Sequence, residues 1–145
     1  MDLPDKLILD ANILFSFFNP NSSRFKIVEA LIKKGIILIS PDFVLEELLN
    51  NKEKIKGFAK ISEEKFNLAF SSLKDNIEII PEEKYKSLLP ESRELSPHDN
   101  TKDYPYFALS LSLNNCPIWS DELAFKKQSK VKIFSTKELL KLSKE

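Results

Sequence analysis

The acidic residue Asp10 lies where the sequence pattern predicts the end of a buried β-strand. It closes the apolar segment Lys6–Asp10 and is followed by the residues ANIL, so apolar side chains flank this carboxylate. A buried carboxylate without a partner is costly in free energy, so Asp10 requires a cation, a metal ion or several hydrogen-bond donors. Asp10 is therefore a candidate metal ligand, and its alternative role is to cap the turn that follows.

Two more segments carry acids where strands end or helices begin. The strand formed by the residues PIW runs directly into Ser120, Asp121 and Glu122, and Asp103 precedes the helix expected over Pro105–Asn114. As helix N-caps, Asp103 and Asp121 would have a purely structural role. A helix N-terminus favours an anion whether or not a metal is present, so the local pattern leaves both roles open.

A pair of adjacent acids lies in the helix expected over Pro41–Asn51. The apolar residues of this segment, among them Val44 and Leu48, gather on one side of a helix that turns by about 100° per residue. On this projection Glu47 lies near the edge of the apolar side and Glu46 lies almost opposite. Glu47 is therefore the candidate to point inward, and Glu46 is expected in solvent.

The composition excludes most other kinds of reactive site. One His and one Cys cannot supply the ligands of a zinc site, and two glycines exclude both a P-loop and a dinucleotide-binding loop. Oxygen-only ligands suit hard divalent ions such as Mg²⁺ or Mn²⁺, which also bind substrate phosphates. Because such ions activate water and neutralise charge, a phosphodiester can be cleaved without His, Cys or Arg. The acids thus point to metal-dependent phosphodiester hydrolysis.

Alternating patterns of strand and helix predict the framework that positions these acids. Strands are expected over Lys6–Asp10, Gly35–Ser40, Ile77–Ile80, Pro117–Trp119 and Val131–Ser135. Helices are expected over Ser22–Lys34, Pro41–Asn51, Ser62–Lys74, Glu82–Leu95, Pro105–Asn114, Glu122–Gln128 and Thr136–Lys144. This alternation predicts an α/β fold, a three-layer α/β/α sandwich with a mainly parallel central sheet. Ligands of such sheets bind beyond the carboxyl ends of the strands, where the acids are expected.

Local signatures mark some of the boundaries. Ser40 and Pro41 are expected to begin a helix, as N-cap and first helical residue, and the segment 135–138 fits a capping box. The polar stretch Pro90–Asp103 is expected to form a loop, with His98 on the surface. A long loop in a compact domain often lies near a functional site.

Length and charge set the remaining limits. The 145 residues are expected to form one domain, 1–145, and 22 basic residues balance 22 acidic ones. A metal bound by several acids would cancel part of their charge, so neutrality does not argue against a nucleic-acid substrate. The lysines of segments 51–60 and 126–132 are candidates to contact phosphates, or form an ordinary solvated face. With neither a membrane span nor a signal peptide in the sequence, a cytoplasmic protein is expected.

At these residues the sequence resembles the PIN-domain family of metal-dependent ribonucleases, in its archaeal and bacterial toxin-like branch. The matching segments are LILDANILFSFF, SPDFVLEELLN and KDYPYFALSLSLNNCPIWSDELAFKKQ, in the family's order. The resemblance implies an α/β/α sandwich and an acidic pocket that binds one or two Mg²⁺ or Mn²⁺ ions. In the family's pattern Asp10 and Asp103 match the two most constant acids, Glu47 the helix acid, and Asn12 and Ser120 supporting polar residues.

The fourth motif departs from the family pattern. The family usually has Ser or Thr, then any residue, then Asp; here the last place holds Glu122, with Asp121 one residue earlier. Either acid could be the fourth metal ligand, or the longer Glu could weaken the site. The alternative function is therefore a PIN-like RNA- or protein-binding module with weakened catalysis.

The resemblance also implies an activity and partners. It predicts an endoribonuclease that hydrolyses RNA phosphodiester bonds, acting as the toxin of a toxin–antitoxin pair. We therefore expect an RNA substrate, a small antitoxin protein and a homodimer, with no membrane association.

A rival enzyme class is a phosphatase of the HAD type, which also opens with a strand that ends in Asp. In such phosphatases a second Asp follows two residues after the first, whereas this chain has Asn12 at that place.

Overall fold

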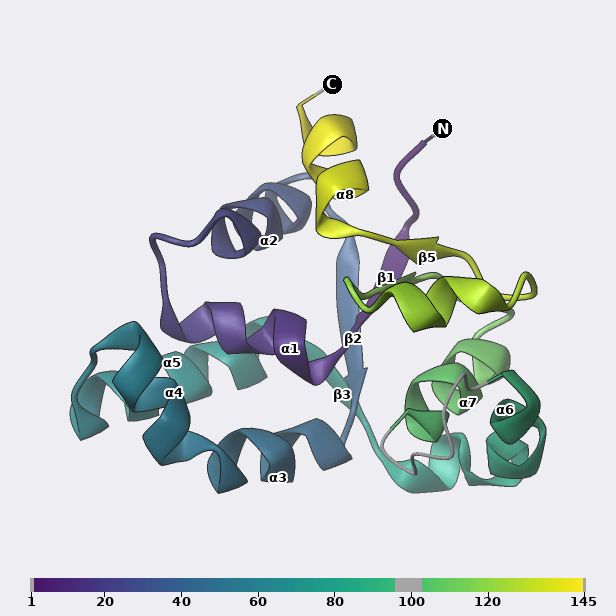
Figure 1. The fold of residues 1–145 in the computed structure, drawn as a ribbon, viewed down its shortest axis with the longest axis horizontal. Helices are drawn as coiled ribbons and strands as arrows, with labels where there is room; N and C mark the ends of the chain where they lie inside the picture. The colour runs from purple at the N-terminus through teal and green to yellow at the C-terminus, as the bar shows by residue number, and fades with distance from the viewer. Residues whose placement is uncertain (1, 96–102, 145) are drawn as a thin grey trace.

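A parallel β-sheet forms the centre of the computed structural model, which describes residues 2–95 and 103–144 (Figure 1). Its five strands are ordered β3-β2-β1-β4-β5, and every neighbouring pair is parallel. The strands are β1 (Lys6–Leu9), β2 (Ile37–Pro41), β3 (Glu78–Ile80), β4 (Ile118–Trp119) and β5 (Ile133–Phe134).

Helices cover both faces of the sheet. On one side lie α1 (Ala11–Leu14), α2 (Ser23–Lys33), α4 (Lys52–Ala59) and α5 (Glu63–Asn76), and on the other lie α6 (Leu89–Leu95) and α7 (Tyr104–Ser112) (Figure 1). Helix α3 (Phe43–Asn50) follows β2, and α8 (Thr136–Ser143) packs against α2. The predicted three-layer α/β/α architecture is confirmed. None of the helices within the described ranges is long and apolar enough to span a membrane.

Short 3₁₀ helices complete the chain. They are η1 (Phe15–Phe18), η2 (Glu82–Lys84), η3 (Lys86–Leu88) and η4 (Leu123–Lys127). The helix expected over Glu82–Leu95 is thus two 3₁₀ turns followed by α6, and the helix expected over Glu122–Gln128 is the 3₁₀ helix η4. Helix α6 also occupies the first part of the expected loop Pro90–Asp103, and residues 96–102, with His98, lie outside the described residues.

The central strands are apolar on both faces because both are covered by helices. Leu7, Ile8 and Leu9 of β1 are fully buried, as are both residues of β4. The indole N–H of Trp119 donates to the Thr136 hydroxyl at the start of α8, at 3.0 Å. The largest side chain of the core is thereby tied to the last helix of the chain.

The strand order reverses at β1, whose neighbours are β2 and β4. The register places Leu9 beside Trp119, so the chain leaves the sheet at two adjacent points, Asp10 and Ser120. In open parallel sheets ligands bind in the crevice beyond the carboxyl ends of the strands at such a reversal. The topology therefore brings the first and fourth acidic motifs to one place.

The expected helix start at Ser40 and Pro41 is wrong. Strand β2 continues through Pro41, and α3 begins at Phe43 without a side-chain cap from Asp42. The Ser40 hydroxyl donates to the Leu9 carbonyl of the neighbouring strand, at 2.5 Å, instead of accepting from a helix N–H. A long-range contact thus overrides the local helix-start signature.

Two helical segments were not expected from the sequence, α1 with η1, and α4. Helix α1 is a single turn, too short to show a helical period, and it begins where the Asp10 carboxylate accepts from the Ile13 N–H. Helix α4 buries only Ile55 and contains a glycine. The capping box of Ser135 and Glu138 ahead of α8 is confirmed.

Candidate functional site

Asp10 lies at the junction of β1 and α1 with 5% of its surface exposed. Its Oδ1 atom accepts from the Ile13 N–H at 2.9 Å, and its carboxylate is also hydrogen-bonded by the Ser120 side chain. Burial raises the pKa of Asp10 to about 6, although these bonds and the nearby Arg24 charge act to lower it. Asp10 does cap the following turn, but its hydrogen bonds do not fully offset the cost of burying the charged carboxylate.

Ser120 and Glu122 form a tight turn at the end of β4. The Glu122 N–H donates to the Ser120 Oγ atom at 3.1 Å, and Ser120 is almost completely buried. Because Ser120 contacts both Asp10 and the backbone of Glu122, it couples the first motif to the fourth.

Four of the predicted acids line one cavity of about 200 Å³ at this edge of the sheet, here called the acidic pocket. Asp103 is buried at the start of α7, Glu47 is half-buried on α3, and Glu122 is exposed at the end of β4. The residues lining the acidic pocket are Asp10, Ala11, Asn12, Phe15, Phe43, Glu47, Asp103, Tyr106, Glu122 and Phe125. Four separate segments of the chain thus contribute a carboxylate to a single pocket.

The helix projection correctly distinguished the two acids of α3. Glu46 is exposed, whereas Glu47 is half-buried and lines the acidic pocket. The N-cap interpretation of Asp103 is only partly right: it occupies the N-cap position of α7, with Pro105 in the first turn, but its side chain makes no capping hydrogen bond.

Tyr106 was not identified from the sequence, although it forms part of the acidic pocket. Its hydroxyl accepts from the Ala11 N–H at 2.8 Å, and its ring lies against Phe43 in an edge-on contact. Burial, followed by the charges of Asp10 and other pocket acids, raises the pKa of this phenol well above its usual range. Tyr106 therefore stays protonated and ties the start of α1 to α7.

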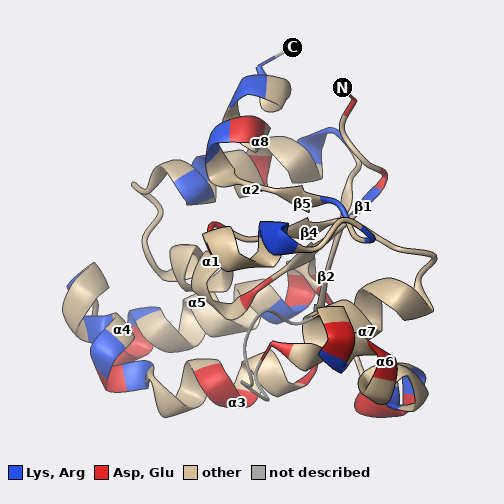
Figure 2. Cartoon of the chain, turned by 45° about the vertical axis from the view of Figure 1, so that its right-hand side comes forward, with Lys and Arg blue, Asp and Glu red and all other residues tan. Residues whose placement is uncertain are grey.

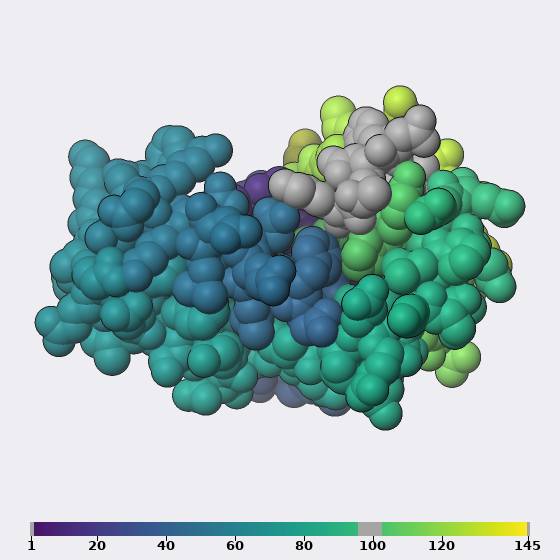
Figure 3. Space-filling model, turned by 90° about the horizontal axis from the view of Figure 1, so that it is seen from below, coloured from purple at the N-terminus to yellow at the C-terminus, as the bar shows by residue number. Residues whose placement is uncertain are grey.

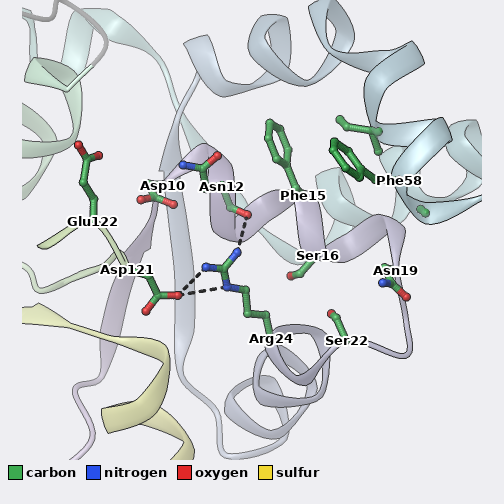
Figure 4. Close-up of a pocket in the computed structure, with 12 residues that line it drawn as sticks. Asp10, Asn12, Phe15, Ser16, Asn19, Ser22, Arg24, Phe58, Asp121 and Glu122 are labelled. Atoms are coloured by element: carbon green, nitrogen blue, oxygen red, sulfur yellow. Dashed lines mark hydrogen bonds and ion pairs between the residues drawn. The ribbon is translucent and has the colours of Figure 1, made fainter.

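Asp121 makes a different set of contacts from its neighbour Glu122. Its Oδ2 atom accepts from the Arg24 guanidinium, with Nη2 at 2.7 Å and Nε at 3.2 Å. Its carboxylate also accepts from the Thr136 N–H at 2.6 Å and from the Thr136 hydroxyl. Burial alone would raise the pKa of Asp121, but the bonds from Thr136 and Arg24 lower it below its ordinary value. In Figure 4 Asp121 extends toward Arg24, and Glu122 extends in another direction.

As an N-cap, Asp121 differs from expectation. Its side chain binds the first N–H of α8 rather than an N–H of the 3₁₀ helix that follows it. Arg24, its partner, is one of only two arginines in the chain, and that scarcity is the signal that could have marked it.

A second cavity, of about 590 Å³, adjoins the acidic pocket and is called here the flanking pocket (Figure 4). It shares Asp10, Asn12, Phe15 and Glu122 with the acidic pocket. Its lining comprises Asp10, Asn12, Phe15, Ser16, Asn19, Ser22, Arg24, Ile55, Phe58, Ala59, Asp121 and Glu122. The two pockets therefore lie side by side beyond β1 and β4.

The chemistry of the acidic pocket fits a hard divalent ion. Its donors are carboxylate, amide and hydroxyl oxygens, which Mg²⁺ and Mn²⁺ prefer. Within the described part of the chain, no three acidic side chains lie close enough together to hold one ion directly. Mg²⁺ usually keeps several waters and takes only one or two carboxylates, so this spacing remains compatible with a hydrated ion.

Several candidate phosphate-binding lysines already have acidic partners. Lys52 and Lys56 of α4 both form ion pairs with Glu63, and Lys126 and Lys132 both pair with Glu138. Figure 2 shows basic and acidic residues mixed along α4, and only acidic ones on α3. Pairing of this kind is typical of an ordinary solvated surface.

Comparisons with known proteins agree with this architecture. The chain is similar in fold to a chain of the crystal structure of VapBC2 from Rickettsia felis bound to a DNA fragment from their promoter. The TM-score is 0.67 and the identity 20%, over 90% of this chain and 98% of that chain. No curated protein sequence matches this chain. The family model of the PIN domain matches residues 8–141, nearly the whole sequence, and the chain therefore belongs to the PIN-domain family.

Proposed function

We propose that the protein is a divalent-metal-dependent endoribonuclease whose acidic pocket holds the ion. PIN domains are generally nucleases, which supports hydrolysis of a phosphodiester. The observation that carries the proposal is the position of Asp10, a buried carboxylate with a raised pKa at the reversal of the strand order, beside three other carboxylates. The carboxylates proposed to hold this hydrated ion, directly or through its waters, are Asp10, Glu47, Asp103 and Glu122.

The residues of the pocket have distinct proposed roles. A bound Mg²⁺ or Mn²⁺ ion would neutralise charge on the scissile phosphate and activate water. Ser120 orients the Asp10 carboxylate through its hydroxyl, and Asn12 lies at the rim where its amide can orient water or a phosphate oxygen. Tyr106 holds the α1 backbone in place and limits access of bulk water to the buried side of the pocket.

We assign the fourth ligand position to Glu122 rather than Asp121. The carboxylate of Asp121 is engaged by a guanidinium and by two donors of Thr136, which would compete with a metal ion. Glu122 lines the acidic pocket together with the other three acids. It also stands at the place where the family pattern has Asp, two residues after Ser120.

The proposed partners follow from the same fold. The similar structure from Rickettsia felis is a VapBC complex, and by this analogy the chain would be the toxin of a toxin–antitoxin pair. Its substrate would be RNA, and a small antitoxin protein would silence it. We also propose a homodimer, which sedimentation of the purified chain would test.

The direct test is cleavage of a mixed RNA pool by the purified protein. We expect cleavage with Mn²⁺ or Mg²⁺, none in EDTA, and a loss of about a hundredfold or more in the Asp10→Asn variant. Asp75→Asn, an exposed position on α5, is the matched control and should cleave like the wild type. Equal rates for wild type and Asp10→Asn, or activity in EDTA, would contradict the proposal.

A second candidate function is an RNA- or protein-binding module with weakened catalysis. It is favoured by the wide spacing of the described acids and by Glu122 in the place of the family's Asp. RNA binding without cleavage at any Mn²⁺ concentration would support this alternative.

A further inference from the structure

We propose that the flanking pocket binds one unpaired RNA base next to the scissile phosphate. The inference rests on the proposed function, because the acidic pocket is taken to hold that phosphate. The flanking pocket adjoins the acidic pocket, and four residues line both. A strand whose phosphate lies at Asp10 would therefore direct a neighbouring nucleotide into the flanking pocket. Its volume, about 590 Å³, is within the usual range for small-ligand sites, about 300–1,000 Å³.

Two phenyl rings on the wall of the flanking pocket can stack a base. Phe58, on α4, is 80% exposed, and Phe15, in η1, is half-buried. Figure 4 shows both rings on the side of the pocket away from Arg24. A single exposed Phe on a surface needs no explanation, but Phe58 lines a cavity together with a second ring, and each ring offers an apolar face on which a base can stack. Stacking on such rings tolerates any base, because every base presents a π-face.

Helix α4 holds Phe58 over the pocket. Ile55, three residues earlier, is buried and also lines the pocket. Lys52 and Lys56 tie α4 to α5 by ion pairs with Glu63. Figure 3 shows that part of the N-terminal segment is visible between the surface of α4 and α5 and the rest of the molecule. The aromatic wall is thus anchored to α5 and to the core by ion pairs and by the burial of Ile55.

The opposite wall is polar and carries the ion pair of Arg24 and Asp121. Arg24 uses Nε and Nη2 for Asp121, and its Nη1 lies 3.5 Å from the Asn12 carbonyl oxygen. A guanidinium has five N–H donors, so Arg24 has donors left for a phosphate or a base edge. Asn19 and Ser22 add further polar atoms to this wall. Aromatic rings facing an ion pair, an amide and a hydroxyl match a nucleotide base, which has an apolar face and polar edges.

This geometry predicts a preference for single-stranded RNA. In an A-form duplex each base is stacked between its neighbours and cannot enter a pocket, whereas bases of loops and single strands can be splayed out and stacked on aromatic side chains. Truncation of one stacking ring typically lowers affinity by about tenfold or more.

The test measures RNA binding and base stacking separately from cleavage. The parent is the Asp10→Asn variant in Mg²⁺, compared with the same protein carrying Phe58→Ala, Phe58→Trp or Leu68→Ala. Leu68, on α5, is 64% exposed and serves as the control for loss of an exposed apolar side chain. The probe is a single-stranded RNA that carries 2-aminopurine, whose fluorescence is quenched by stacking; a duplex of the same sequence is titrated in parallel.

We expect Phe58→Ala to weaken single-strand binding about tenfold and to reduce the quench, with the melting temperature unchanged. Phe58→Trp should retain both, Leu68→Ala should match the parent, and duplex binding should not respond to Phe58. Equal affinity and quench for Phe58→Ala and the parent would overturn the proposed base-binding site. The flanking pocket would then be a candidate surface for a protein partner.

Cleavage by otherwise wild-type protein separates this inference from the proposed function. If Mn²⁺-dependent cleavage of the same RNA is seen and Phe58→Ala leaves its KM unchanged, the base site is wrong and the nuclease proposal stands. If the wild type neither binds nor cleaves RNA, both are overturned. A KM raised about tenfold with kcat nearly unchanged supports both.

Discussion

Glu122→Gln is expected to lower Mn²⁺-dependent RNA cleavage by about a hundredfold or more while leaving the melting temperature unchanged. Asp121→Asn is expected to lower the melting temperature and to leave cleavage nearly unchanged. Glu122 lines the acidic pocket, where its carboxylate is proposed to bind the ion, and its side chain is exposed, so the substitution costs little packing. The Gln amide keeps the shape of the side chain but removes the charge that binds a divalent cation.

The expected effect of Asp121→Asn follows from its contacts. Its side chain is 29% exposed and accepts from Arg24 and Thr136, which joins α2 to the start of α8. Loss of charge-assisted bonds of this kind typically costs about 1–3 kcal/mol in the free energy of unfolding. Cleavage should remain within a few-fold of wild type at temperatures well below melting.

Urea denaturation measures the stability of the two variants, and initial rates measure their RNA cleavage, each against the wild type. Glu46→Gln, on the exposed side of α3, is the matched control for a lost Glu charge near the site and should change neither quantity. The opposite ranking, in which Asp121→Asn abolishes cleavage and Glu122→Gln does not, would show that Asp121 is the fourth ligand.

Asp10→Asn is expected to stabilise the metal-free protein at neutral pH by about 2–3 kcal/mol. Burial raises the pKa of Asp10 from 3.8 to about 6, and a tenfold change in an ionisation constant corresponds to about 1.4 kcal/mol. The folded state therefore binds more protons than the unfolded state between about pH 4 and pH 6. Stability of the wild type must fall as the pH rises through this window.

The Asn variant removes this pH dependence because its amide is neutral at every pH. Its oxygen can still accept from the Ile13 N–H, so the cap of α1 is retained. Urea denaturation in EDTA at several pH values measures the difference, which should be full above pH 6 and vanish below pH 4. The exposed variant Asp75→Asn should follow the wild type. An Asp10→Asn protein less stable than wild type at pH 7 would mean that the carboxylate is stabilised as an anion.

The sequence predicted the parts of the site that depend on short-range pattern. Apolar runs located β1 and β4, and the acids after them gave Asp10 and the Ser120–Glu122 segment. The helical period separated Glu47 from Glu46. These features are local because strand and helix periods fix which way neighbouring side chains point.

The remaining parts depend on contacts between distant residues. Asp121 differs from Glu122 because it binds Arg24, which is 97 residues away in the sequence, and Thr136 at the start of α8. Ser40 binds the Leu9 carbonyl across the sheet, which no helix-start pattern reveals. Phe58 becomes distinctive only when α4 brings it to the wall of the flanking pocket.

Binding of Mn²⁺ measured by calorimetry tests the central claim, that the carboxylates of the acidic pocket hold a divalent ion. The wild type is expected to bind Mn²⁺ saturably at millimolar concentration or below at pH 7, and more weakly at pH 5, where Asp10 is largely protonated. Asp10→Asn and Glu122→Gln should each weaken binding about tenfold or more, and Asp121→Asn should not. No saturable heat with the wild type, or the same affinity in Asp10→Asn, would contradict the account.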